Sequence, residues 1–487
     1  MAEHEKNHAV AKPLIAMVLA SMAAAGVAPG PSAGAPSPVH PGDNIQAMIN
    51  ARAAGTVFHL AAGTYRLQDL APKNGDQFIG VPGHTILDGA AVVANWTHGG
   101  GYWEASGLPV LPVDGGVAEA NHPLATHDQD LFIDNTLYQR VDALNEVHAG
   151  TWYFNEATGT AYISANPTGH TVELSEAQNA FTGHSQAIWG GTNVVLQGLT
   201  VEKYATPAQS AAVYGGLDWS VRNCTVEWNH GGGVALYSGS TMSGGEADHN
   251  GQTGITGAFA SNVTITNVEV ASNNYAGYDP NWEAGGIKFV NSQGIQITNN
   301  DVHDNNGVGI WGDTNMADTT ITGNTVDNNV TYGILHEVSY AATIRGNLVR
   351  FNGRAGTRGR LLMSQIMLTD SRGVEIAGNE VEIAKGAGNG ITMIDYDRGA
   401  GARGRYVVAD NDVHDNIIIH DDVGGLDGMG FDDNADAASS NVWDRNTYIV
   451  PDAGARYWYF DGAPRNWTYL QARTPYERHG RLIPYAR

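Results

Sequence analysis

The chain contains one cysteine in 487 residues, Cys224. A single thiol rules out an internal disulfide, and no cysteine and histidine spacing typical of a zinc site is present. Cys224 belongs to a short segment, Cys224-Thr-Val226, that is similar to an Asn-x-Val motif repeated later in the chain. We therefore expect Cys224 to be a small buried apolar residue rather than a nucleophile.

Positive charge is also scarce. The chain has 26 lysines and arginines against 50 aspartates and glutamates, which gives a formal net charge of −24 at pH 7. Such a surface repels polyanions, so nucleic acid and anionic membranes are not expected partners. A neutral oligosaccharide or polysaccharide is compatible with this charge. No feature of the sequence indicates an oligomeric state.

Long apolar runs are missing after the N-terminal region. The one early run, Leu14 to Val27, is too short to span a bilayer comfortably. Lys6 and Lys12 precede it, and small residues suited to cleavage lie near its end. We expect a signal peptide over residues 1–28 and a linker rich in proline, alanine, serine and glycine over residues 29–40. The protein is then secreted or periplasmic.

One strand sequence, by contrast, occurs in three similar copies. The copies are 23 and 24 residues apart and read Gly286-Ile-Lys-Phe-Val290, Gly309-Ile-Trp-Gly-Asp313 and Gly333-Ile-Leu-His-Glu337. Because strand residues alternate between two faces, the first isoleucine of each copy points to the opposite face from Lys288, Trp311 and Leu335.

A shorter motif, Asn-x-Val or a close relative, recurs with steps of 24, 23, 32 and 32 residues over its last five copies. A period of this size, without helical patterning and with 62 glycines in the chain, indicates a parallel β-helix. We expect right-handed coils, with Ile287, Ile310 and Ile334 stacked inside and the asparagines stacked as a ladder. Leucine-rich repeats have similar periods, but their L-x-x-L-x-L signature is missing. The copies are Cys224-Thr-Val226, Asn300-Asp-Val302, Asn324-Thr-Val326, Asn347-Leu-Val349, Asn379-Glu-Val381 and Asn411-Asp-Val413.

Other segments predict how the solenoid is interrupted and closed. Residues 41–90 start with Gly42-Asp43-Asn44, which can cap a short helix that plugs the first coils. Over residues 91–180 the repeat stops, and alternating strands such as Thr151 to Phe154 predict an inserted antiparallel β domain. The β-helix occupies residues 181–450, with the repeats resuming near Gln186. Residues 451–487 are aromatic and irregular, and we expect them to cap the last coil.

Two acids stand out on the outward face of the repeated strands. Asp313 and Glu337 occupy the same place in successive copies, so they share one face. Neighbouring coils lie ~4.8 Å apart, which brings the two carboxyl groups to roughly 5 Å, the separation found in retaining glycosidases. Two like charges at this distance disfavour simultaneous ionisation, and the mechanism needs one ionised and one protonated carboxyl.

These features resemble a known family. The plugged solenoid, the segment from Thr151 to Ile163 and the Asp313 and Glu337 strands are similar to secreted right-handed parallel β-helix carbohydrate enzymes, in particular the β-xylosidase-type retaining glycoside hydrolases (glycoside hydrolase family 120-like). The helix of that family is interrupted by a β-sandwich, so the resemblance implies a sandwich-like insert. It also implies that Asp313 is the nucleophile and Glu337 the acid/base.

Several neighbours of the pair are candidate substrate-binding residues. Trp311 could stack on a sugar ring or simply cover coil surface. Lys288 could hydrogen-bond a hydroxyl, lower the pKa of the nucleophile or pair with a nearby acid. His336 falls on the inward face opposite Gly312, and it is either a core histidine or a site residue if the strand ends there.

Two more segments extend the candidate site. The loop Tyr278 to Glu283 is placed to overhang the pair, with Trp282 as a subsite wall beside Glu283, or it is a simple turn. Asp370, Asp395 and Asp397 continue an acidic stripe on later coils, as substrate-binding residues or as the true catalytic pair.

No cofactor is expected. The segment Phe431-Asp-Asp-Asn-Ala-Asp436 is similar to an acidic calcium loop but lacks the Asp-x-Asp-x-Asp-Gly spacing, so calcium is the one ion left open. No phosphate loop or dinucleotide fingerprint occurs. The glycine-rich segments follow the solenoid period and need no nucleotide to explain them.

Three classes of function are compatible with these features. The first is a retaining glycosidase that releases sugars from a neutral oligo- or polysaccharide. The second is a polysaccharide lyase or uronate epimerase on the same fold, which would need basic residues along its groove. The third is a non-catalytic, carbohydrate-binding or adhesive solenoid, which measurable turnover would exclude.

Overall fold

The computed structural model describes residues 37–183, 190–355, 361–431 and 440–485. The predicted signal peptide, most of the predicted linker, Gln186 and the part of the candidate calcium loop from Asp432 to Asp436 lie outside the described residues. Within the described residues the chain is nearly all β, and no helix there is long and apolar enough to cross a membrane.

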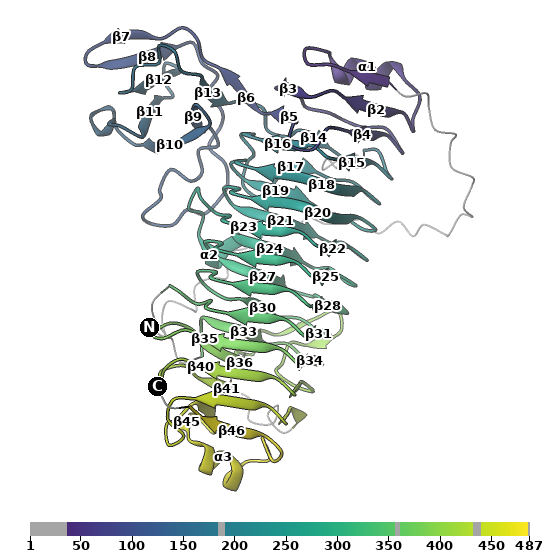
Figure 1. Cartoon of the computed structure of the whole chain (residues 1–487), viewed down its shortest axis with the longest axis vertical. Helices are drawn as coiled ribbons and strands as arrows, with labels where there is room; N and C mark the ends of the chain where they lie inside the picture. Colours follow the sequence, from purple (N-terminus) through teal and green to yellow (C-terminus); the bar gives the residue numbers. More distant parts are fainter. Residues whose placement is uncertain (1–36, 184–189, 356–360, 432–439, 486–487) are drawn as a thin grey trace. The chain divides into compact units, whose positions relative to one another are not determined.

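The β-helix is built from two sheets of stacked strands (Figure 1). Each coil gives one strand to sheet 1 and, in most coils, two short strands to sheet 2, and strands of successive coils pair in parallel. Parallel pairing with a turn of about two dozen residues is the arrangement that the repeats predict, so the parallel β-helix is confirmed.

Sheet 1 carries the repeated strands identified in the sequence. Its strands are β14 (Phe181–Thr182), β17 (Ala211–Tyr214), β19 (Gly232–Ala235), β21 (Thr253–Ala258), β24 (Gly285–Val290), β27 (Val308–Asp313), β30 (Ile334–Glu337), β33 (Ser364–Thr369), β36 (Asn389–Asp395), β41 (Asp427–Phe431), β44 (Trp458–Phe460) and β45 (Ala463–Arg465).

Sheet 2 consists of two rows of strands joined through the long strands β18 and β20. The first row is β1 (Ser37–Val39), β2 (Val57–Leu60), β4 (Gln77–Ile79), β15 (Val195–Gln197), β18 (Ser220–Glu227), β20 (Thr241–Asp248), β22 (Thr264–Thr266), β25 (Gln296–Thr298), β28 (Thr319–Thr322), β31 (Ala342–Arg345), β34 (Val374–Ala377), β39 (Asp412–His414) and β42 (Val442–Asp444). The second row adds β3 (Gly63–Arg66), β5 (Thr85–Asp88), β16 (Thr200–Glu202), β23 (Glu269–Ala271), β26 (Asp301–His303), β29 (Thr325–Asp327), β32 (Leu348–Arg350), β35 (Glu380–Ile383), β40 (Ile417–His420), β43 (Thr447–Val450) and β46 (Arg481–Pro484).

The core of the β-helix is a continuous stack of aliphatic side chains. Ile287 pairs with Ile310, which pairs with Ile334, and all three are buried in the main apolar cluster. Burying a side chain of this size contributes about 1.5 to 3 kcal/mol relative to leaving it exposed. The predicted inward stack is therefore confirmed. Cys224 is also buried in this core, and burial raises the pKa of its thiol to about 11, as expected for an inert residue.

An asparagine ladder joins the coils at the corner between the two rows of sheet 2. Asn300, Asn324, Asn347 and Asn379 each donate from Nδ2 to the asparagine of the next coil at 2.9 to 3.0 Å. The copy after Asn379 is Asn416, 37 residues on, and not the Asn411 predicted from the motif. Asn411 precedes β39, which pairs with β34 in the first row, whereas the ladder asparagines Asn379 and Asn416 follow these two strands. The sequence motif therefore matched the corner before the first row instead of the corner after it.

Both ends of the described β-helix are closed by short helices. Asn44 caps α1 (Ile45–Ala51) by accepting a hydrogen bond from the Ala47 amide, and Ile45 and Ile49 are buried on the first coil. At the other end, Asn466 caps α3 (Trp467–Arg473), which packs Leu470 against the last coil. Such plugs keep the apolar interior of a solenoid away from water.

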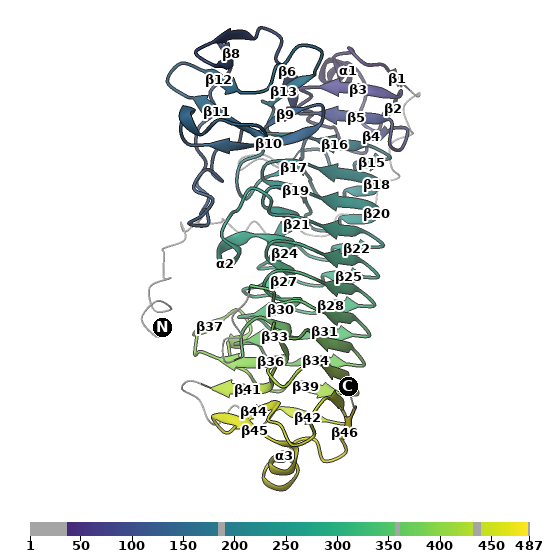
Figure 2. The same ribbon diagram turned by 60° about the vertical axis from the view of Figure 1, so that its left-hand side comes forward.

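The insert forms a separate sheet beside the first coils (Figure 2). Its strands follow the order β6 (Ala90–Val92), β13 (Val172–Ser175), β9 (Leu131–Ile133), β10 (Thr136–Val141), β11 (Thr151–Asn155), β12 (Thr160–Ile163), β8 (Tyr102–Ser106) and β7 (Thr97–Gly99), and the short 3-10 helix η2 (Leu144–Glu146) lies between β10 and β11. Pairing is antiparallel except between β10 and β11, which are parallel, so the expectation of a purely antiparallel unit is wrong there. Trp152 and Phe154 lie in the core of the insert itself.

Candidate functional site

The two acids predicted to be catalytic lie next to each other. Asp313 ends β27 and Glu337 ends β30, and the two residues are partners in the parallel register. Ile310 and Ile334, three residues earlier, face the core, so period-two alternation points both carboxyl groups away from it. Neighbouring strands lie about 4.8 Å apart, which is compatible with the carboxyl separation of a retaining glycosidase.

The contacts of Asp313 include a cation and a hydroxyl group. Lys288 Nζ lies 3.2 Å from Asp313 Oδ2, and Thr314 Oγ1 donates to Asp313 Oδ1 at 2.7 Å. The Asp313 side chain keeps 10% of its surface exposed. A nearby ammonium group stabilises the ionised form of a carboxylate, which is the form that a nucleophile needs.

Glu337 accepts hydrogen bonds from three different side chains. Trp311 Nε1 donates to Oε1 at 3.0 Å, and Arg398 Nη1 donates to Oε2 at 2.8 Å. Thr369 Oγ1 donates to the same Oε2 at 3.3 Å. The side chain of Glu337 is 14% exposed, so one edge of the carboxyl group is accessible from outside.

Trp311 connects the two acids but offers no open ring. Lys288 Nζ lies 3.2 Å from the centroid of the Trp311 ring, within the range of a cation–π contact, while the indole N–H is bonded to Glu337. Only 6% of Trp311 is exposed. The prediction of Trp311 as a stacking platform for sugar is therefore wrong, because the ammonium group occupies its face.

Lys288 is buried between two carboxylates. Besides Asp313 it contacts Glu283 Oε2 at 2.8 Å, and it donates to the Trp282 carbonyl at 3.4 Å. These contacts correspond to the ion-pair role that the sequence left open for Lys288, and they leave it little surface for direct contact with a sugar hydroxyl.

Glu283 and Trp282 stand on a short helix where the sequence predicted a loop. Helix α2 (Pro280–Glu283) is capped by Asp279, and Trp282 is half-buried. An arm of the insert fixes the approach to this helix, since the Val117 carbonyl accepts from the Asp279 amide at 2.8 Å. The insert thus reaches the site through its arm, and this contact positions Glu283 beside Lys288.

His336 lies inside the coil. It faces Gly312 of the preceding strand, it is fully buried, and its Nε2 atom bonds the Tyr340 carbonyl at 2.7 Å. Burial lowers the pKa of His336 to about 4, so the ring is neutral near pH 7. The prediction of His336 as a substrate-binding residue is wrong, and the alternative of a core histidine is right.

Asp370 and Asp395 are also buried, one place out of step with the outward face. Glu337 pairs with Thr369 and Thr369 pairs with Ile394, so these two residues continue the outward row. Asp370 instead accepts the Tyr396 amide at 2.9 Å, and Asp395 accepts the Val408 amide at 3.0 Å. Neither is available to a substrate in this structure, which corrects the predicted acidic stripe.

Arg398 is the main site residue that sequence reasoning missed. It belongs to an excursion from sheet 1 that follows β36 and contains the small hairpin of β37 (Ala400–Gly401) and β38 (Gly404–Arg405). In the sequence, the long step after Asn379 indicates an insertion, but it does not show where the inserted segment lies in the fold. Asp397, on the same excursion, is exposed and pairs with Arg405.

No metal centre is formed by the described part of the chain, where no group of three or more histidine, cysteine, aspartate and glutamate side chains is arranged to hold an ion. The arrangement that remains is a row of three acids, Glu283, Asp313 and Glu337, neutralised in part by Lys288 and Arg398. Such a row can transfer protons and attack an electrophilic carbon.

Comparison with known proteins supplies the handedness of the coils. A family model described as a right-handed β-helix region matches residues 210–358. No curated protein matches the chain. Together with the parallel sheets, this match confirms the predicted right-handed parallel β-helix.

Solved structures that match this chain are distant from it in sequence. The complex of XylC with xylose has a TM-score of 0.65 and 15% identity over 83% of this chain and 80% of that chain. A glycoside hydrolase has a TM-score of 0.46 and 10% identity over 82% of this chain and 89% of that chain. The A-module of the Azotobacter vinelandii mannuronan C-5 epimerase AlgE4 has a TM-score of 0.41 and 13% identity over 91% of this chain and 93% of that chain. At 15% identity the similarity to XylC concerns the fold alone.

Proposed function

We propose that the protein is a retaining glycoside hydrolase that acts on a neutral oligo- or polysaccharide. The observation that carries the proposal is the register pairing of Asp313 and Glu337 on one outward face. Their different partners suit different roles, since the Asp313 carboxylate is paired with a buried ammonium group and Glu337 with a guanidinium group on an excursion from the sheet.

In the first step Asp313 attacks the anomeric carbon while Glu337 gives its proton to the leaving oxygen. The bond to the leaving group breaks, and an ester forms between the sugar and Asp313. Lys288 keeps the attacking carboxylate ionised until that bond forms. In the second step Glu337 takes a proton from water, which attacks the same carbon and restores Asp313 with net retention of configuration.

Arg398 has to leave Glu337 for the first step. Nearly half of its side chain is exposed, and it holds the Oε2 atom that would carry the proton. A substrate hydroxyl that binds the guanidinium group would release this oxygen. Once Arg398 has left, Oε2 of Glu337 has room for the proton that the first step transfers.

The charge balance favours a neutral sugar over a uronate. Lys288 and Arg398 each already contact a carboxylate, and the three acids of the row outnumber them. A lyase or epimerase must bind the carboxylates of its substrate, which requires cations that are not already paired. The site offers little of this kind, so the glycosidase is the stronger proposal.

A panel of chromogenic glycosides tests this function, run beside an ultraviolet assay for the unsaturated product of a lyase. Because XylC is described in complex with xylose, an aryl β-xyloside is the first substrate of the panel. Hydrolysis with a first product of retained configuration by proton NMR supports the proposal. An inverted product, or the ultraviolet signal without hydrolysis, contradicts it.

Variants assign the two roles. Asp313→Ala should remove activity, since loss of covalent catalysis costs on the order of several kcal/mol in the transition state. Glu337→Ala should impair substrates with poor leaving groups far more than activated aryl glycosides, and azide should partly rescue it with a glycosyl azide of retained configuration. Near-normal rates in both variants would show that the pair is not catalytic.

A further inference from the structure

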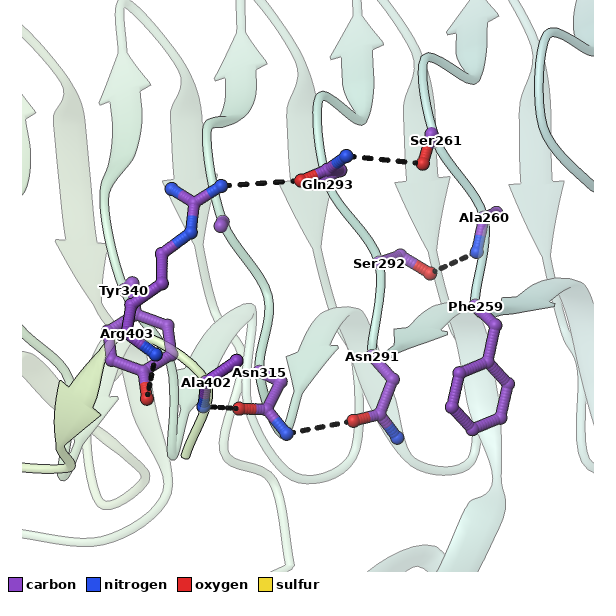
Figure 3. Close-up of a pocket in the computed structure, with 11 residues that line it drawn as sticks. Phe259, Ala260, Ser261, Asn291, Ser292, Gln293, Asn315, Tyr340, Ala402 and Arg403 are labelled. Atoms are coloured by element: carbon purple, nitrogen blue, oxygen red, sulfur yellow. Dashed lines mark hydrogen bonds between the residues drawn. The ribbon is translucent and has the colours of Figure 1, made fainter. Parts of the chain in front are cut away.

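A groove of about 360 Å³ lies beside the acid pair, across the turns that follow four successive strands of sheet 1 (Figure 3). The turns after β21, β24, β27 and β30 provide one side, and the hairpin loop between β37 and β38 provides the other. The lining of the groove includes Phe259, Asn291, Gln293, Asn315, Tyr340 and Arg403.

The groove is continuous with the acid pair along the chain. Asn315 comes two residues after Asp313, and Tyr340 comes three residues after Glu337. The Asn291 amide donates to the Thr314 carbonyl at 2.7 Å, so the floor of the groove is joined directly to the end of the Asp313 strand. A sugar chain that enters the acid pair therefore has its next unit near this groove.

Phe259 presents its ring to solvent at one end of the groove, as Figure 3 shows. Its relative exposure is 67%, although phenylalanine is among the residues most often fully buried. The residue also has φ of +53°, in the left-handed region that a residue with a side chain rarely adopts. An exposed aromatic ring on a strained turn is a suitable surface for the C–H face of a sugar ring.

The polar groups of the groove are oriented by one another. Asn315 Nδ2 donates to Asn291 Oδ1 at 2.9 Å, and Asn315 Oδ1 accepts the Ala402 amide at 3.2 Å (Figure 3). This arrangement fixes the side-chain amide group of Asn291. The Nδ2 atom of that group donates to no other residue of the described chain. A preorganised donor of this kind costs little side-chain entropy when a hydroxyl binds.

Arg403 adds a second set of donors on the opposite side. Its Nη2 atom contacts Gln293 Oε1 at 3.3 Å and Asp318 Oδ2 at 2.9 Å, and 43% of the side chain is exposed. Within the described residues both of these side-chain hydrogen bonds start from Nη2, which leaves the other guanidinium nitrogens as donors for a ligand. Because Asp318 neutralises the charge, the donors suit a neutral hydroxyl better than an anion.

The same excursion from sheet 1 serves the groove and the acid pair. Arg398 contacts Glu337 and Arg403 reaches Gln293, which lies on a turn two coils before Glu337. Tyr340 anchors the loop by accepting the Arg403 amide at 3.2 Å and donating to the Gly404 carbonyl at 2.9 Å. A ligand in the groove would contact the segment that holds the partner of Glu337.

We propose that this groove is a second sugar subsite, in which a neutral hexose or pentose unit stacks on Phe259 and accepts hydrogen bonds from Asn291 and Arg403. The proposal rests on the proposed function, since it assigns the groove to the next unit of the same substrate chain. It makes the protein selective for oligosaccharides over simple glycosides.

The kinetic test compares an aryl β-xyloside with xylotetraose and xylohexaose in wild type, Phe259→Ala and Phe259→Tyr. In Phe259→Ala, the ratio of kcat/KM for xylohexaose to kcat/KM for the aryl glycoside should fall ~10-fold, as for loss of one well-packed aromatic contact. Phe259→Tyr should restore the ratio, because it keeps the ring. Val423→Ala, at another exposed apolar residue outside the groove, serves as the matched control.

A binding test separates failure of the subsite from failure of the proposed function. Isothermal titration of xylohexaose and cellohexaose into Glu337→Gln and into the double variant with Phe259→Ala does not depend on turnover. Weaker binding in the double variant supports the subsite even if no glycosidase activity is found. No binding of either hexasaccharide to Glu337→Gln, or equal affinity and an equal kinetic ratio with and without the Phe259 ring, overturns it.

Discussion

Sheet 1 carries two pairs of acids that differ in what they bind. Asp313 and Glu337, on β27 and β30, contact side chains that are charged or carry a hydroxyl or indole group. Asp370 and Asp395, which follow or end β33 and β36, are buried and accept backbone amides. Thr369 and Ile394 continue the outward row of Asp313 and Glu337, and each acid of the second pair, here called the inner pair, comes one residue later.

The inner pair nevertheless supports the outer one. Asp370 Oδ1 accepts the amides of Tyr396 and Arg398, at 2.9 and 3.4 Å, at the point where the chain leaves β36. These bonds set the direction of the excursion that carries the Arg398 guanidinium group to Glu337. Carboxylates that differ by one residue in register can therefore have different roles, one at the candidate site and one in holding the backbone.

The largest effect should separate the two pairs by activity. Asp313→Asn keeps the shape of the side chain but removes the proposed nucleophile, so kcat/KM for the best aryl glycoside should fall ~1,000-fold or more. Asp370→Asn keeps an acceptor for both amides and should stay within ~10-fold of wild type. Steady-state kinetics checks this, with thermal unfolding to verify that both variants are folded. Equal losses in the two variants would remove the distinction.

The next effect concerns the link between the pairs. Arg398→Ala should lower kcat/KM by ~10- to 100-fold, because it removes the guanidinium group that leaves Glu337 and binds a substrate hydroxyl in the proposed first step. Arg405→Ala is a matched control on the same excursion, since its exposed side chain pairs with Asp397 and not with the site. If both arginine variants behave alike, the excursion acts as a whole and Arg398 has no specific role.

The third effect is on the free energy of unfolding. Asp370→Ala should lower the free energy of unfolding by about 1 to 3 kcal/mol, because the buried Tyr396 and Arg398 amides lose their acceptor. Asp397→Ala, at an exposed acid two residues beyond Asp395, should change it by less than about 0.5 kcal/mol. Urea unfolding followed by circular dichroism measures both. A small change in the first variant would mean that water readily replaces Asp370.

The last effect is a pH dependence specific to Asp370. Burial raises the pKa of Asp370 from its ordinary value of 3.8 to about 6. Between these values the folded chain holds a proton that the unfolded chain has lost, so the free energy of unfolding falls as pH rises from 3.8 to 6. Asn has no proton to lose, and Asp370→Asn should therefore gain on the order of 3 kcal/mol relative to wild type across this window. A constant difference between the two proteins from pH 4 to 6.5 would contradict it.

The sequence predicted those features of the site that lie inside regular strands. Alternation and a constant step placed Ile287, Ile310 and Ile334 in the core and paired Asp313 with Glu337. These predictions succeed because the parallel ladder permits only one register when one face is buried.

Prediction failed where the chain leaves a strand. Asp370 has φ of +46°, just past the end of β33, and sequence alone does not show such a turn for a residue other than glycine. Arg398 reaches Glu337 through an irregular excursion, whose path depends on hydrogen bonds such as those of Asp370 and Tyr340. The Asn411 error has the same origin, since the length of an insertion hides which corner a motif occupies.

The 37-residue step between Asn379 and Asn416 has a consequence for how such a chain can diverge. The 2.9 Å hydrogen bond from Asn379 to Asn416 joins the two successive coils at this corner. The spacing between the coils therefore does not depend on the length of the excursion after β36. Loop closure costs grow slowly with length, by about 0.6 kcal/mol for each doubling. The excursion after β36 can therefore change in length or sequence while the coils that carry Asp313 and Glu337 are kept.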